Sequence, residues 1–112
     1  AGPPGIQGYI AAKHAVVGLM RGWSNVLAKE GIRVNTVHPT GVNSPMVANE
    51  AFGRFVTEYP EVAAIMQNPF PVPNGLLEPE DVTNSIMHLI SDAGQYITGT
   101  TFRGDAGFSS RA

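Results

Sequence analysis

The chain contains no cysteine, which excludes disulfide bonds and thiolate metal sites. It has no apolar run near the roughly 20 residues that a membrane-spanning helix needs. It has no cluster of Lys and Arg of the kind that binds nucleic acid or a membrane surface, and its formal net charge is -2. We therefore expect a small-molecule partner, no nucleic acid and no membrane, and we take the cytoplasm as the expected compartment.

The sequence also lacks an initiating Met. It opens with Ala-Gly-Pro-Pro-Gly, and Tyr9, a candidate catalytic residue, already follows as the ninth residue. With 43% hydrophobic residues, 112 residues could form one small domain with a single core, and nothing indicates two. The position of Tyr9 nevertheless leads us to expect that residues 1–112 are part of something larger.

A long amphipathic segment covers Tyr9 to Glu30. Its apolar residues recur at spacings of three and four, which predicts one helical face: Ala12, Val16, Leu19, Met20, Trp23 and Leu27. Gly31 is a typical helix C-cap. The β-branched residues between Ile32 and His38 then predict a buried strand that Pro39 ends.

The stretch from Ser44 to Leu77 differs from its surroundings because five prolines interrupt it. The pattern predicts short helices near 52–59 and 62–66 and a loop at 68–75. Such a long detour is more often functional than not. We interpret residues 44–77 as a lid over an apolar substrate pocket, and ordinary core packing is the alternative.

A second regular unit closes the chain. Glu78-Pro79-Glu80-Asp81 is typical of a helix start, with proline and acids in the first turn. Val82, Ile86, Leu89 and Ile90 predict its buried face, and Tyr96 to Phe102 predicts another strand. The order of helix, strand, lid, helix, strand indicates an α/β fold.

Tyr9 and Lys13 carry the clearest chemical signal. Four residues is just over one helical turn, so their side chains share a face. A nearby ammonium favours the phenolate, and Tyr9 could then act as a general base for a hydroxyl proton. A surface Tyr and Lys that are merely neighbours are the alternative, and the pair alone does not decide between the two.

The surrounding segments resemble the C-terminal half of the short-chain dehydrogenases/reductases. Tyr9-Ile10-Ala11-Ala12-Lys13 is similar to the family's Tyr-x-x-x-Lys, and residues 31–39 are similar to the strand that leads to the nicotinamide end of the cofactor. Residues 78–82 and 96–99 resemble the last helix and strand. Within the family, residues 13–21 and 38–43 look most like the carveol-dehydrogenase and mycofactocin-associated group of actinobacterial enzymes.

The resemblance implies the C-terminal half of a Rossmann-type doubly wound parallel sheet, with NAD as cofactor and NADP not excluded. It implies reversible hydride transfer between a hydrophobic secondary alcohol and a ketone, with Tyr9 as acid/base. Lys13 would activate Tyr9 and bind the nicotinamide ribose. The implied cofactor-binding residues are Tyr9, Lys13, Pro39, Thr40, Gly41, Val42 and Ser44.

The chain also departs from the family pattern. Thr40 stands where a Gly commonly follows the proline, and residues 103–107 read Arg-Gly-Asp-Ala-Gly where many members have Val-Asp-Gly-Gly. The family's catalytic Ser and Gly-rich phosphate loop would both precede Ala1. The resemblance therefore implies that residues 1–112 are the catalytic and substrate-binding part of one domain, that the N-terminal cofactor-binding half is absent, and that the chain alone is inactive.

Other candidates carry weaker signals. His14, His38 and His88 lack metal-ligand spacing, and we expect no metal site. Asp105 could be catalytic in isolation, but the family resemblance implies a turn-forming residue near the C-terminus. An alternative to catalysis is a non-catalytic family member or fragment that serves in oligomer assembly, because the family's long helices commonly pack against symmetry mates. The expected partners are the N-terminal half and further copies in a homo-oligomer, such as a tetramer.

Overall fold

The structure, a computed structural model, describes residues 6–111, so residues 1–5 and Ala112 lie outside it. Its helices and strands follow one another in the order α1 (Ile6–Leu27), β1 (Thr36–Pro39), α2 (Glu50–Glu58), α3 (Pro60–Ile65), α4 (Pro79–Ile90) and β2 (Thr101–Gly104). Short 3-10 turns occupy Ala28–Glu30, Pro73–Gly75, Asp92–Gly94 and Phe108–Ser110. The expected order of elements is confirmed.

The end of the first helix follows the glycine signal. After α1 one 3-10 turn continues to Glu30, and Gly31 adopts a left-handed conformation with φ 71°. Its N–H donates to the Ala28 carbonyl at 3.0 Å. A side chain at this φ would be strained, so the predicted C-cap is confirmed.

The two strands pair in parallel, from Thr36 opposite Thr101 to Pro39 opposite Gly104. Both are shorter and begin later than the sequence predicts. The strand expected from Ile32 starts at Thr36 and includes Pro39, and the strand expected from Tyr96 starts at Thr101. The predicted strand boundaries are therefore wrong.

Long-range hydrogen bonds explain the late start. The Asn35 side chain donates to the Ile97 carbonyl at 2.9 Å and accepts from the Thr100 N–H at 3.2 Å. Thr98 accepts the Val34 N–H through its hydroxyl. Most of these bonds use side chains where a ladder would use backbone groups. The exception is the Gly99 N–H, which donates to the Val34 carbonyl at 2.8 Å, and Gly99 turns the chain with φ 70°. The ladder begins only at the Thr36 N–H, which donates to the Thr100 carbonyl at 3.1 Å.

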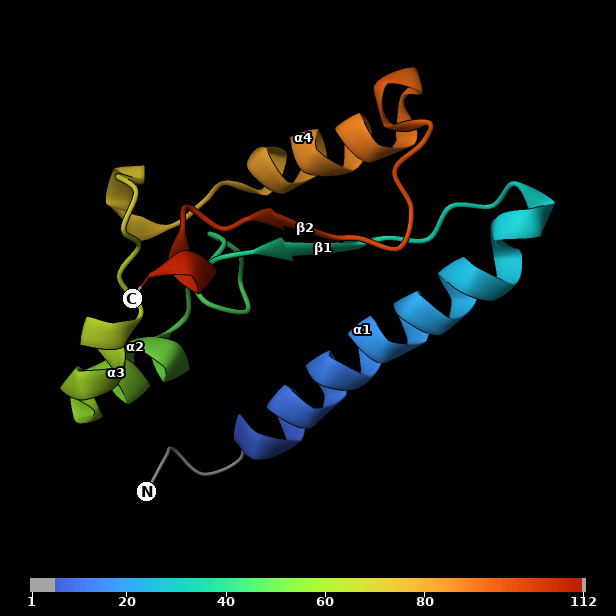
Figure 1. Cartoon of the computed structure of the whole chain (residues 1–112). Helices are drawn as coiled ribbons and strands as arrows, with labels where there is room; N and C mark the ends of the chain where they lie inside the picture. The colour runs from blue at the N-terminus through green and yellow to red at the C-terminus, as the bar shows by residue number, and fades with distance from the viewer. Residues whose placement is uncertain (1–5, 112) are drawn as a thin grey trace.

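The helices lie on opposite sides of the strands, with α4 along one face and α1 along the other (Figure 1). On the α4 side, the rings of His88 and Phe102 stack with centroids 5.7 Å apart. On the α1 side, Ser24 packs so closely on Gly99 that an added Cβ would lie 3.1 Å from its hydroxyl. This arrangement is a doubly wound α/β unit with one helix per face.

Residues 44–77 contain the two short helices expected. Asn49 caps α2 by accepting the Phe52 N–H at 2.8 Å. The detour closes where the Leu77 N–H donates to the Gly41 carbonyl at 2.9 Å and the Leu77 carbonyl accepts from Asn43 at 2.7 Å. An excursion of more than 30 residues therefore leaves and rejoins the fold at one point, directly after β1.

The chain exposes more surface than a monomer of its size normally does. Its accessible surface is 8040 Å², whereas a folded monomer of 11.9 kDa exposes about 5,900 Å². The radius of gyration is 16.2 Å, against about 13 Å for a compact domain. Met20 and Leu89 are the only large apolar residues that are buried in the described part. None of the described helices combines the length and apolar character needed to cross a membrane.

Candidate functional site

The first turns of α1 bring Tyr9 and Lys13 together. The Lys13 ammonium lies 5.2 Å from the centroid of the Tyr9 ring. Both residues are exposed, and Tyr9 keeps 53% of its surface accessible. A tyrosine hydroxyl in this setting can meet a small molecule, and the ammonium lies within cation–π distance of the ring.

These two residues lie on the side of α1 that turns toward the strands. Lys13, Met20 and Ser24 are spaced by seven and four residues, which places them on one stripe with Tyr9. Met20, 2% exposed, and the buried Ser24 mark this stripe as the packed one. The side chains of this stripe are buried near the C-terminal end of α1 and exposed to solvent at Tyr9.

The direction of α1 determines which part of the fold lies at the same end as its exposed first turns. α1 runs opposite to β1, so its first turns lie at the end of the molecule where both strands finish (Figure 1). The helices α2 and α3 lie at that same end. In open α/β sheets the carboxyl ends of the strands form the usual ligand site.

The turn after β1 offers unpaired backbone groups. Gly41 and Asn43 use their backbone groups on Leu77, and the intervening Val42 bonds no described residue through its N–H. The Thr36 N–H points toward β2, so by alternation the carbonyl of Pro39 points away from it. The Val42 N–H and the Pro39 carbonyl, one donor and one acceptor of this turn, are thus without a partner among the described residues.

This pair fits the nicotinamide carboxamide that the family resemblance implies. A carboxamide presents one acceptor and two donors, which matches the Val42 N–H and the Pro39 carbonyl. The Ser44 hydroxyl has no partner among the described residues and is available to a ligand. The Thr40 hydroxyl is not available to donate to a ligand, because it donates to the Asn68 side-chain oxygen at 2.7 Å.

The three histidines are not assembled into a site. His14 hydrogen-bonds the Ile10 carbonyl, His38 hydrogen-bonds Thr36 at 2.7 Å, and His88 stacks on Phe102. Across residues 6–111 no group of His, Cys, Asp and Glu could hold a metal ion. His14 and His38 thus bond within their own elements, and His88 packs α4 on β2.

Asp105 holds the turn after β2, as expected. It is buried, and its carboxylate accepts hydrogen bonds from the Gly107 N–H and from the N–H and hydroxyl of Ser109. The bond from the Ser109 hydroxyl is the main reason that the pKa of Asp105 lies below its usual value. The interpretation as a turn-forming residue is confirmed.

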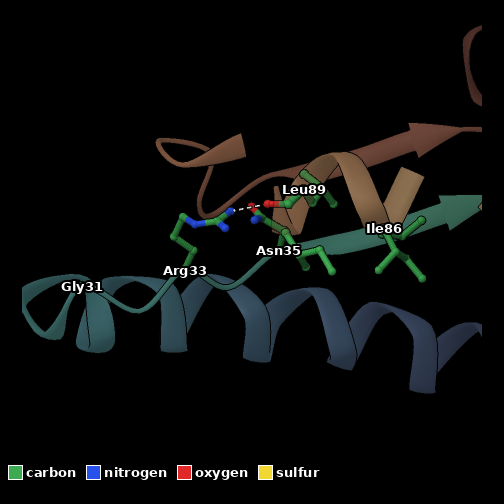
Figure 2. A pocket seen from close by; sticks show the side chains of 7 residues that line it. Gly31, Arg33, Asn35, Ile86 and Leu89 are labelled. Carbon is green, nitrogen blue, oxygen red and sulfur yellow. Dashed lines mark hydrogen bonds between the residues drawn. The ribbon is translucent and has the colours of Figure 1, made fainter. Parts of the chain in front are cut away.

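Arg33 and Asn35 line a hollow of about 530 Å³ at the other end of β1 (Figure 2). Arg33 donates to the carbonyls of Leu89 at 2.6 Å and Gly94 at 2.8 Å, and so caps the end of α4. Ile86 and Ile90 form the apolar side of this hollow. Because it lies at the amino end of β1, away from Tyr9, we interpret it as an uncovered packing surface.

Sequence reasoning missed Arg33, Asn35 and Asn68. Each of the three has a partner 28 to 65 residues away in the chain, and no local spacing reports these contacts, whereas the bond from Asn68 to Gly75 is local. The only available signal was a polar residue type within an apolar segment, which applies to Arg33 and Asn35 between Ile32 and Val37.

Comparison with known proteins gives consistent matches. The profile of a family described as enoyl-(acyl carrier protein) reductase matches residues 1–109. The chain is 46% identical over 109 residues to an uncharacterized oxidoreductase of Mycobacterium tuberculosis, covering 94% of this chain and 38% of that protein. It is 43% identical over 110 residues to (-)-trans-carveol dehydrogenase of Rhodococcus erythropolis, covering 91% and 39%.

Solved structures agree with these matches. Carveol dehydrogenase from Mycobacterium avium in complex with NAD superposes with a TM-score of 0.86 at 34% identity, covering 99% of this chain and 42% of that one. A short chain dehydrogenase from Mycobacterium paratuberculosis bound to NAD gives a TM-score of 0.79, also at 34% identity, covering 92% and 38%. The chain thus spans about two fifths of the length of the relatives it matches.

Proposed function

Because this chain belongs to the short-chain dehydrogenase/reductase family, we propose that it is the catalytic part of an NAD-dependent oxidoreductase. The reaction interconverts a hydrophobic secondary alcohol and a ketone. Family membership confirms the resemblance and the Rossmann-type fold class that the sequence indicates. The observation that carries the proposal is the Tyr9 and Lys13 pair, open at the end of the molecule where β1 finishes.

Tyr9 is the acid/base in this proposal. In alcohol oxidation its phenolate oxygen takes the hydroxyl proton while the carbon of the alcohol gives up a hydride, which leaves the carbonyl of the ketone. The nicotinamide, when bound, accepts that hydride. In the reverse direction Tyr9 returns the proton to the ketone oxygen. The ammonium of Lys13, 5.2 Å from the Tyr9 ring centroid, stabilises the phenolate form.

NAD is the cofactor we assign, with NADP as the second choice. Neighbouring structures hold NAD or NADH, and one holds NADPH. Lys13 would bind the nicotinamide ribose, and the carboxamide would meet the Pro39 carbonyl and the Val42 N–H. Thr40 and Gly41 shape that turn through their bonds to the lid, and the Ser44 hydroxyl faces no other described partner.

We expect an apolar substrate because residues 44–77, the proposed lid, carry several aromatic side chains. In α2 the rings of Phe52 and Phe55 have centroids 6.3 Å apart, and those of Phe55 and Tyr59 are 5.2 Å apart. Relatives include a carveol dehydrogenase and, at 32% identity, a cyclohexanol dehydrogenase of Acinetobacter. We propose residues 44–77 as the substrate lid, and a cyclic secondary alcohol as the first compound to test. Membership of the mycofactocin-associated group stays a prediction.

The excess surface supports a larger assembly. The area above that of a normal monomer is roughly 2,000 Å², which is more than the roughly 800 Å² that each partner buries in a standard protein interface. We propose that residues 1–112 are the C-terminal part of one domain, covered by an N-terminal cofactor-binding half. The outer face of α1, where Trp23 is 55% exposed, then contributes to a homo-oligomer such as a tetramer in the cytoplasm. The chain alone would be inactive.

The test uses the complete protein and two tyrosine variants. Tyr9→Phe should lower kcat by about two to four orders of magnitude with little change in cofactor affinity, because only the proton-transfer group is lost. Tyr96→Phe is the matched control, since Tyr96 is almost fully exposed at the other end of the fold. Equal turnover in the Tyr9→Phe variant and the control would refute the assignment and favour the assembly role.

A further inference from the structure

The lid divides into two parts that are held in different ways. Every hydrogen bond of residues 44–66 with a described partner stays within that segment. Examples are the Ala48 N–H to the Ser44 carbonyl and the Asn49 side chain to the carbonyls of Pro45 and Met46. The helices α2 and α3 pack mainly on each other. We call residues 50–65 the helical hairpin, and no described hydrogen bond joins it to the sheet.

Residues 67–77, the return segment, bond to both strands' ends. The Phe70 N–H donates to the Ala106 carbonyl at 3.0 Å, and Arg111 donates to the Gln67 carbonyl at 3.2 Å. Leu77 closes the segment on Gly41 and Asn43. Three prolines, at 69, 71 and 73, also fix the backbone φ of this segment. The return segment therefore belongs to the rigid part of the fold.

Asn68 lies near the junction of the helical hairpin and the return segment. Both the oxygen and the nitrogen of its side-chain amide form hydrogen bonds. The oxygen accepts the Thr40 hydroxyl at 2.7 Å, and the nitrogen donates to the Gly75 carbonyl at 3.2 Å. The first bond reaches the turn after β1, and the second closes the loop of the return segment on itself. Asn68 is half-buried, so water competes less for these bonds than at the surface.

We propose that Asn68 is a positioning residue that holds the return segment on the cofactor-binding turn through Thr40, so that lid motion is confined to the helical hairpin. This inference rests on the proposed function, because it assigns the turn at Thr40 to cofactor binding. Loss of the Asn68 bonds frees the Thr40 hydroxyl and leaves the return segment held only by its backbone bonds and by Arg111. Cofactor binding weakens as a result, while the proton-transfer pair on α1 stays in place.

The test compares three variants of the complete protein. Asn68→Leu removes both bonds and should raise the KM for NAD about tenfold, a size typical of one or two lost hydrogen bonds, with kcat changed less than twofold. Asn68→Asp keeps the acceptor for Thr40 but loses the donor to Gly75, so it should retain most of the affinity for NAD. Asn84→Leu is the control, because Asn84 is exposed on α4.

Hydrogen exchange without cofactor or substrate gives the second readout. In the wild type the amides of Phe70 and Leu77 should exchange far more slowly than those of the hairpin. Asn68→Leu should speed the exchange of these two amides with α4 unchanged, although their own backbone bonds keep them slower than the hairpin. Equal rates in the wild-type segments, or a Leu variant that matches the Asn84→Leu control, would overturn the proposal. A uniform rise in exchange over the whole protein would also overturn it, since it indicates a merely structural role. Exchange needs no turnover, so it decides the role of Asn68 even if no alcohol is oxidised.

Discussion

The two long helices α1 and α4 flank the same pair of strands and are stabilised in opposite ways. α4 is secured at both ends by this chain. Glu78 and Asp81 form a reciprocal capping box at its start, with the Glu78 N–H donating to the Asp81 carboxylate at 2.8 Å. Arg33 binds the last carbonyls at its end, and Leu89, 5% exposed, is buried.

α1 has no comparable support. It has no acidic residue in its first turn. Its large apolar side chains Val16, Leu19, Trp23 and Val26 are all exposed, some of them directly beside the buried Met20. Large apolar side chains gathered on one exposed helix are normally covered in a larger protein. The comparison teaches that the helix carrying the proposed acid/base pair is the one that this chain alone covers least.

The largest expected effect concerns the cation on α1. Lys13→Ala in the complete protein should lower kcat by about two orders of magnitude or more and raise the KM for NAD, because one ammonium serves both the phenolate and the cofactor. Lys29→Ala, an exposed lysine just beyond α1, is the control. Steady-state kinetics with varied NAD measures both constants. If neither kcat nor the KM for NAD changed, Lys13 would have no functional role, and the two helices would differ only in how they are stabilised.

The next effect concerns the surface of α1. Residues 1–112 expressed alone should not form a stable monomer, because the outer face of α1 and the free edge of β1 remain uncovered. Light scattering should show association or aggregation, and thermal melting should lack a cooperative monomer transition. A monodisperse monomer with a sharp melt would contradict this account of α1.

A smaller effect is expected at the end of α4. Arg33→Met leaves the carbonyls of Leu89 and Gly94 without their donor, which should destabilise the complete protein by about 2 to 3 kcal/mol. The control is Arg54→Met on the exposed side of α2. Urea unfolding measures the loss. The kcat at low urea should stay within twofold of wild type, and a selective loss of kcat would contradict a structural role for α4.

The smallest effect depends on pH. Hydrogen bonds from Ser109 hold the pKa of Asp105 below its usual value, so its contribution to stability is present above pH 4 and is lost as the pH falls through the lowered pKa. Asp105→Asn should therefore melt at a lower temperature than wild type at pH 7, and the gap should narrow on acidification below pH 4. If the difference in melting temperature between Asp105→Asn and wild type did not change with pH, the negative charge of Asp105 would contribute nothing to stability.

Local signals predicted the helices well and the strands poorly. Gly31 and the three-four spacing of apolar residues fixed the end of α1, and Glu78 to Asp81 fixed the start of α4, because each depends on residues within one or two turns. The strand starts depend on Asn35 and Gly99, which are 64 residues apart. No spacing along the chain reveals that the Asn35 side chain replaces a ladder bond.

The residues of the candidate site show the same difference between local and long-range signals. The Tyr9 and Lys13 spacing is local, so the sequence predicts their shared face, and their chemical roles stay a proposal. The contact between Thr40 and Asn68 spans 28 residues and lies outside any regular element. The sequence therefore indicates which residues could carry the chemistry, and the structure shows what holds the turn beside them.

The most direct test follows the hydride itself. The complete protein is incubated with NAD and a cyclic secondary alcohol that carries deuterium on its carbinol carbon, and the nicotinamide is analysed by mass spectrometry. The account predicts one deuterium in the reduced cofactor and an equal amount of ketone, with transfer nearly abolished in Tyr9→Phe. A protein that binds NAD yet transfers no label from any of a panel of hydrophobic secondary alcohols would contradict it.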